Sequence, residues 1–186
     1  MRRSVAAVVA AMVLVGACGG GGAEYDVPAG SVQLVENAVA LGTVSRSQAI
    51  DEASARVQFK VLQPGFVPGG GYRLVVIEAQ LPNPIEALGN DGRSNAVAVL
   101  TWLTGRASDA ETSRIDLAQF SRATEPPPGL AEADSGEEGV RFFYGKSSAG
   151  VEAAWITADR GFSLQATGPE LPEEDEVRKL FASIRE

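Results

Sequence analysis

Alternating hydrophobic and polar positions predict a domain built mainly from β-strands. Six segments have the length and the β-branched or aromatic content of strands, with Gly, Pro, Ser or Asn near their ends: 72–79, 95–103, 113–120, 140–145, 151–157 and 161–167. A seventh, 57–63, alternates Val57, Phe59 and Val61 with polar residues. Segment 95–103 is apolar at both alternations, which is typical of a central strand covered on both faces. Short Gly-containing turns join the last three segments and indicate an antiparallel meander.

Helical periodicity occurs near the end of the chain. Four apolar residues recur there at i, i+3, i+4 and i+7: Val177, Leu180, Phe181 and Ile184. Acidic residues occupy the first turn of this segment, and basic residues follow toward its end. This order agrees with the helix dipole, so we expect an amphipathic helix over about 173–185. Earlier in the chain, Ser45 and Gln48 fit a capping box and predict a short helix over about 46–55.

These elements together predict one α+β domain over residues 32–186, with an antiparallel sheet of about six or seven strands, a short N-terminal helix and an amphipathic C-terminal helix that lies on the sheet. Two long connections, 81–95 and 122–138, interrupt the pattern. The second is acidic, contains three consecutive prolines and lacks an apolar period. We therefore expect it to be a solvated, disordered spacer and not a binding site.

A different hydrophobic pattern occupies the N-terminus. Arg2 and Arg3 precede an uninterrupted apolar run from Val5 to Val15. This run has the length of the hydrophobic region of a secretory signal peptide, whereas a helix that spans a bilayer needs about 20 residues. We therefore expect residues 1–17 to be a signal peptide that is cleaved after Ala17.

The residues around the cleavage position, Val15-Gly16-Ala17-Cys18, resemble the lipobox of bacterial lipoproteins, and Cys18 is the only cysteine in the chain. The resemblance implies that diacylglycerol is attached to the Cys18 sulfur and that a fatty acid such as palmitate acylates the new amine. Two or more acyl chains hold a protein stably on a membrane. Residues 18–31, which include four consecutive glycines, then form a flexible tether. The alternative is an ordinary cleavage site that leaves Cys18 as a free thiol in a secreted protein.

The domain also contains an ordered set of motifs: a helix, F-x-V-x-x-P-G-F-V-P-x-G-G-Y-R-L, two Trp-containing strands, G-F-x-L and a closing amphipathic helix. The matching residues are Phe59, Pro64, Pro68, Gly71, Tyr72, Trp155, Gly161 and Phe162. Over 46–186 this order resembles a bacterial domain of unknown function, found in extracytoplasmic lipoproteins and in proteins similar to anti-sigma factors and lipoprotein carriers. The resemblance implies a curved antiparallel sheet with the C-terminal helix packed across one face, and aromatic side chains as core anchors.

Composition excludes several classes of activity. The chain has 16 basic and 24 acidic residues, and removal of a leader with Arg2 and Arg3 would leave 14 basic residues and a formal charge of −10. That balance argues against nucleic acid as the partner, because nucleic-acid binding needs a basic surface. The chain has no histidine and one cysteine, which excludes zinc enzymes, cysteine–histidine hydrolases and serine–histidine triads. We expect neither a cofactor nor a bound metal.

Three functions are compatible with these features. The first is a non-catalytic binding or sensing module, anchored through Cys18 on the extracytoplasmic face of the cell membrane or outer membrane, with an envelope protein as its partner. The second is a carrier of lipids or lipoproteins with an apolar cavity between sheet and helix. The third is an enzyme that uses paired carboxylates, with Glu137/Glu138, Asp51/Glu52 or Glu173–Glu176 as candidates. Solvation or helix capping explains each of these pairs, so we predict that the protein is not an enzyme.

Overall fold

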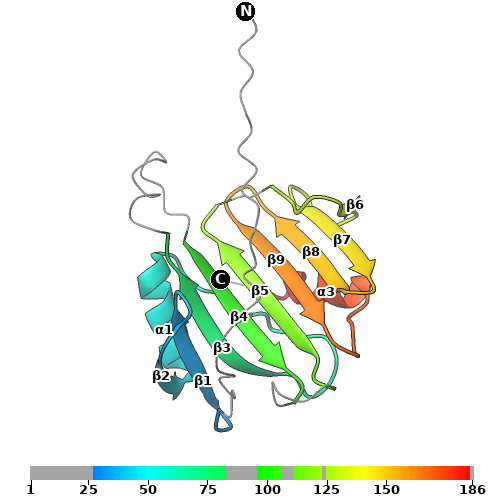
Figure 1. The fold of residues 1–186 in the computed structure, drawn as a ribbon. Coiled ribbons are helices and arrows are strands. Elements are labelled where there is room, and N and C mark those ends of the chain that lie inside the picture. The colour runs from blue at the N-terminus through cyan, green and yellow to red at the C-terminus, as the bar shows by residue number, and fades with distance from the viewer. Residues whose placement is uncertain (1–26, 83–95, 106–110, 123–124, 185–186) are drawn as a thin grey trace, which may run out of the picture.

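The computed structural model describes residues 27–82, 96–105, 111–122 and 125–184. They form an α+β domain in which nine strands make a single twisted sheet and two helices lie beside it (Figure 1). The α+β class agrees with the sequence-based prediction. The sheet is larger than the six or seven strands that the sequence predicted.

The nine strands, in chain order, are β1 (Ser31–Glu36), β2 (Val39–Ser45), β3 (Arg73–Gln80), β4 (Val97–Leu103), β5 (Arg114–Phe120), β6 (Ala131–Ala133), β7 (Arg141–Ser147), β8 (Gly150–Ile156) and β9 (Gly161–Thr167). The helices are α1 (Arg46–Val57) and α3 (Glu174–Ala182). Across the sheet the order is β2-β1-β3-β4-β5-β9-β8-β7-β6. Neighbouring strands are antiparallel except β1 and β3, which run parallel. The long connection that a parallel pair needs is supplied by β2 and α1.

The hairpin of β1 and β2 is the first addition to the predicted sheet. Its two turn residues, Asn37 and Ala38, have φ angles of 45° and 66°, the left-handed region that a tight two-residue hairpin needs. The sequence has no glycine at this turn, so its hairpin signal is weak. The packed structure also begins before β1, since Val27 is buried and its carbonyl oxygen accepts a hydrogen bond of 2.8 Å from Arg73 Nη1.

The predicted strand over 57–63 is wrong. Helix α1 extends to Val57, and the following residues form no strand; they make only an isolated bridge between Pro64 and Ile184. Side chains from other elements take the place of a neighbouring strand, because Val61 N–H donates to Ser54 Oγ and Leu62 N–H donates to Gln119 Oε1. The segment has the apolar content of a strand since Val61 and Leu62 are both buried.

The expectation of a disordered spacer over 122–138 is also wrong for its described part. Residues 131–133 form β6, which pairs with β7. Leu130 packs on a small cluster of Phe143, Ala154 and Ile156. Gly145 permits this approach, because a Cβ there would lie 2.7 Å from Leu130 Cδ2. Residues 83–95, which make up most of the other long connection (81–95), lie outside the described residues.

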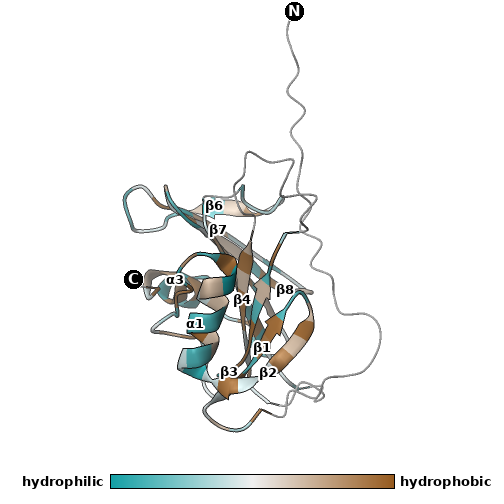
Figure 2. Ribbon diagram, turned by 90° about the vertical axis from the view of Figure 1, so that its left-hand side faces the viewer, coloured by the Kyte–Doolittle hydropathy of each residue, from teal (hydrophilic) through white to brown (hydrophobic). Residues whose placement is uncertain are grey.

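Both helices lie on the same face of the sheet (Figure 2). Helix α1 begins after Ser45, whose Oγ accepts a hydrogen bond from Gln48 N–H, and α3 begins with a capping box between Glu173 and Glu176. Buried residues of both helices belong to the same core as the strand residues that face them. They are Ala49, Ala53 and Val57 from α1, and Val177, Leu180 and Phe181 from α3. The expected packing of the C-terminal helix on one face is therefore present.

Candidate functional site

The two residues with a predicted chemical role, Ala17 and Cys18, lie outside the described residues. The described part begins at Val27. In that part, neither helix has the length and apolar character that crossing a membrane requires. The lipid anchor therefore stays a prediction from the sequence.

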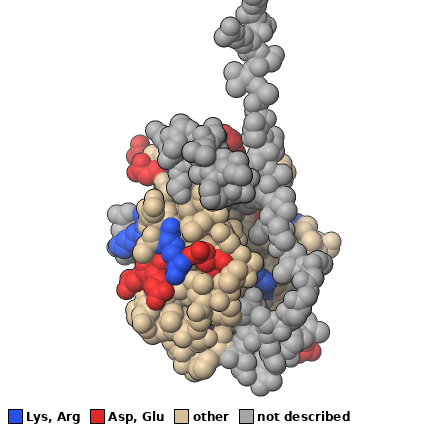
Figure 3. Space-filling model, turned by 60° about the vertical axis from the view of Figure 1, so that its left-hand side comes forward, with Lys and Arg blue, Asp and Glu red and all other residues tan. Residues whose placement is uncertain are grey.

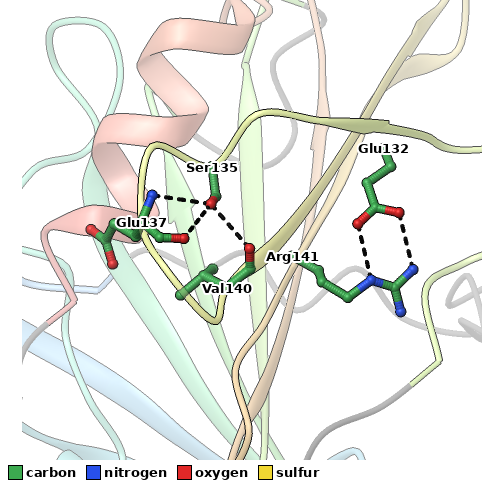
Figure 4. Close-up of polar contacts among 5 residues, drawn as sticks. All are labelled: Glu132, Ser135, Glu137, Val140 and Arg141. Atoms are coloured by element: carbon green, nitrogen blue, oxygen red, sulfur yellow. Dashed lines mark hydrogen bonds and ion pairs between the residues drawn. The ribbon is translucent and has the colours of Figure 1, made fainter.

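The carboxylates considered for catalysis lie at the surface. Asp51 and Glu52 are exposed on α1, and Glu137 and Glu138 are exposed in the turn between β6 and β7. This turn is organised by Ser135, whose Oγ accepts from Glu137 N–H at 3.1 Å and lies 3.0 Å from the Val140 carbonyl oxygen (Figure 4). Both pairs are solvated, as the sequence predicted.

The acidic run 173–176 is used to start helix α3. Glu173 N–H donates to Glu176 Oε2 at 3.0 Å, and Lys146 Nζ donates to Glu173 Oε1 at 2.7 Å. This contact raises the pKa of Lys146 above its ordinary value. Glu174 and Asp175 both form ion pairs with Arg178. Among the described residues, no three acidic, histidine or cysteine side chains are grouped so that they could hold a metal ion.

The helix-covered face is filled with aromatic side chains where a carrier would hold acyl chains. Phe142, Trp155 and Phe181 are buried between the sheet and α3. Their ring centroids are 5.6–6.2 Å apart, and Trp155 stacks on Phe181 with an interplanar angle of 16°. The guanidinium carbon of Arg178 lies 5.6 Å from the Phe142 centroid. These residues are core anchors, as the resemblance implied.

The opposite face, here called the open face, presents a row of polar side chains across four strands. In the strand register, Asp116 of β5 lies between Thr101 of β4 and Gln165 of β9. Gln165 in turn pairs with Glu152 of β8. Successive residues of a strand point to opposite faces. Since Leu100, Leu117, Leu164 and Val151 belong to the helix-side core, the polar row lies on the open face.

Asp116 is the fixed centre of this row. Thr101 Oγ1 donates a 2.6 Å hydrogen bond to Asp116 Oδ1, and Arg114 Nε donates a 2.7 Å bond to Asp116 Oδ2. The Asp116 side chain keeps 15% of its surface exposed, whereas Glu152 is exposed and Gln165 is half-buried. The row thus presents carboxylate and amide groups that can recognise polar groups of a partner.

Near the β6 edge the open face ends in an ion pair. Arg141 Nε donates to Glu132 Oε1 at 3.0 Å, and its Nη2 donates to Glu132 Oε2 at 3.1 Å (Figure 4). The hydrogen bond from Arg141 lowers the pKa of Glu132, and the same bond raises that of Arg141. Arg141 also lies 4.7 Å from the centroid of Phe143. The Glu132–Arg141 pair thus joins the edge strand β6 to its neighbour β7.

No protein-family model, curated protein or solved structure matches this chain. A function must therefore be inferred from its own residues. The sequence did not identify the polar row as a site, because its four members come from four strands and become neighbours only through register. The only local signal was the polar alternation within each strand.

Proposed function

We propose that this protein is a bacterial lipoprotein, held by a lipid on Cys18 on the extracytoplasmic face of the cell membrane or outer membrane. The support is the N-terminal sequence: two arginines, a short apolar run and small residues directly before the single cysteine. Acyl chains replace a spanning helix as the means of attachment. The acidic composition suits a domain that stays clear of anionic headgroups.

The folded domain acts as a non-catalytic binding module, and its open face contacts an envelope protein. The polar row centred on Asp116 supports this part, since two neighbouring side chains hold its carboxylate in place before any partner binds. A preorganised group costs less entropy on binding than a mobile one. The same strands use their other face for the main core. On the open face, two smaller apolar clusters are buried, and Asp116, Gln165 and Glu152 are the members of the polar row that a partner can reach.

The carrier function is less well supported. It needs an apolar cavity between the sheet and α3, and the buried rings of Phe142, Trp155 and Phe181 occupy that position. Close-packed aromatic rings leave little room for an acyl chain.

The anchor is tested by Cys18→Ser in the full-length chain. We expect the parent protein to enter the detergent phase and to carry the mass of a diacylglyceryl-cysteine, and the variant to remain in the aqueous phase. Gly19→Ser, which keeps the thiol, is the matched control and should partition like the parent. Equal partition of the Cys18→Ser variant and the parent would contradict the anchor.

The binding face is tested by affinity capture from solubilised membranes, with mass spectrometry of the captured proteins and lipids. Glu152→Lys reverses the exposed charge in the polar row, and Glu52→Lys makes the same change at an exposed position of α1. We expect Glu152→Lys to lose an envelope protein that the parent and Glu52→Lys both retain. If all three capture the same proteins, the open face is not the binding surface.

A further inference from the structure

The two edges of the sheet are built differently. Strand β6 is three residues long, carries the charged Glu132 and follows the prolines at 126–128. Short edge strands, charges and prolines each prevent another strand from pairing with an edge. Strand β2 has seven residues, none of them charged or proline. The edge at β6 therefore has several protective features. The edge at β2 lacks charge and proline, and its one protective feature is a bulge at Leu41.

Strand β2 exposes two large apolar side chains beside the polar Thr43 and Ser45. Val39 keeps 62% of its surface exposed and Leu41 keeps 45%, which makes them two of the three large exposed hydrophobic residues among those the structure describes. A bulge leaves Leu41 without a partner in β1, because Leu34 pairs with Gly42 and the next residue, Val35, pairs with Ala40. An exposed apolar edge strand is a site at which another chain can add a strand.

We propose that β2 pairs antiparallel with β2 of a second copy of this chain, around a two-fold axis at Leu41. This register places Leu41 opposite its equivalent and Val39 of each copy opposite Thr43 of the other. Apolar and β-branched cross-strand pairs of this kind stabilise antiparallel ladders. A two-fold axis uses the same strand from both copies, so the contact closes at a dimer.

Charge also favours a second copy at this edge. Each copy is acidic overall, with a formal charge of −8 for the full chain and −10 without the leader, so most surfaces of two copies repel each other. Strand β2 carries no charge. On the side of the molecule that holds α1 and β2, the charged side chains form one group, and a wide uncharged surface lies beside it (Figure 3). Two acidic copies can approach most closely along an uncharged strand.

The two ends of β2 have opposite charge. At the hairpin end, Glu78 accepts a 2.9 Å hydrogen bond from Ala38 N–H, and Glu36 is neutralised by its ion pair with Arg56. At the other end, β2 is followed directly by the exposed Arg46. Antiparallel pairing brings the acidic end of one strand near the basic end of the other, at both ends of the interface.

A pair of seven-residue strands buries less surface than the roughly 800 Å² per partner of a standard stable interface. The dimer is therefore weak in dilute solution and forms when copies share a membrane surface, which raises their effective concentration. This step rests on the proposed lipid anchor. The edge pairing itself does not, because it also predicts association of the unanchored chain at high protein concentration.

The pairing is tested by disulfide cross-linking of full-length Leu41→Cys in membranes, with Glu132→Cys at the β6 edge as the matched control. Lipidated Cys18 has no free thiol, so the parent chain should give no disulfide dimer. We expect Leu41→Cys to form a dimer in several-fold higher yield than Glu132→Cys. Adding Val39→Lys and Thr43→Lys to Leu41→Cys should lower that yield several-fold, because four like charges then face one another.

Equal yields at both edges, or no effect of the lysines, would overturn the pairing. Cross-linking of Leu41→Cys to a different protein would overturn it too, because the edge then accepts a foreign strand. A dimer of the parent chain would instead show a free Cys18 thiol and contradict the anchor. The same comparison in a Cys18→Ser background, at high protein concentration, then decides the pairing.

Discussion

The two faces of this sheet come from the same strands and have opposite properties. On the helix-covered face, Trp155, Phe142 and Phe181 are buried and packed against α3. On the open face, Asp116 and Gln165 keep part of their surface accessible. Alternation along each strand places successive side chains on opposite faces, and we propose that the accessible polar side chains of the open face serve recognition. Substitutions on the first face should therefore cost more of the free energy of unfolding than substitutions of accessible side chains on the second face.

The largest expected effect is that of Trp155→Ala. Removing a buried aromatic side chain from a packed core costs about 3–5 kcal/mol of the free energy of unfolding. Gln165→Ala, on the neighbouring strand and the open face, should change it by less than about 0.5 kcal/mol. Urea unfolding followed by tryptophan fluorescence at the remaining Trp102 and by circular dichroism measures both. Comparable losses would show that the two faces do not differ in this way.

Gln119 tests a buried polar group on the helix-covered face. Its side chain accepts from Leu62 N–H at 2.9 Å and donates to Leu62 O at 2.6 Å. Gln119→Leu keeps most of the volume and leaves both backbone groups of Leu62 unpaired, at a cost of about 1–3 kcal/mol. Amide hydrogen exchange at Leu62 should accelerate together with the loss of stability. Gln165→Leu is the matched control, and an equal loss there would contradict the role of these two bonds.

Thr101 tests the polar row itself. Thr101→Val removes the hydroxyl that donates to Asp116 and keeps the shape of the side chain. Because Arg114 still pairs with Asp116, the expected loss is about 1 kcal/mol in thermal or urea unfolding. Thr101→Ser, which restores the hydroxyl, should recover most of it. A serine variant as unstable as the valine variant would assign the effect to packing.

The smallest effect is expected for Glu132→Gln, at an exposed ion pair. Arg141 holds the pKa of Glu132 below its ordinary value of 4.5. A carboxylate with a lowered pKa stabilises the fold above that ordinary value, and its contribution is lost as pH falls through the lowered pKa. The difference in urea midpoint between the parent and Glu132→Gln should therefore shrink to zero in acid. A difference that stays constant with pH would exclude an ionic origin.

Sequence pattern alone located most of the sheet. Strands β3, β4, β5, β7, β8 and β9 correspond to the six segments with strand periodicity, and α3 corresponds to the apolar stripe near the C-terminus. The hairpin of β1 and β2 was missed because β2 is exposed along nearly its whole length, so burial imposes no alternation on it. The segment after Val57 was predicted as a strand since its side chains are buried, although its backbone is bonded to Ser54 and Gln119.

What the sequence by itself determined is local: the chain's periodic elements, its acidity, and a motif ending at Cys18 that resembles a lipobox. Each depends on residues within a few positions of one another. The polar row at Asp116 and the contrast between β2 and β6 were decided only by the tertiary structure. The physical reason is that register and edge position arise from hydrogen bonds between segments far apart in the chain, which the periodicity of one segment cannot specify.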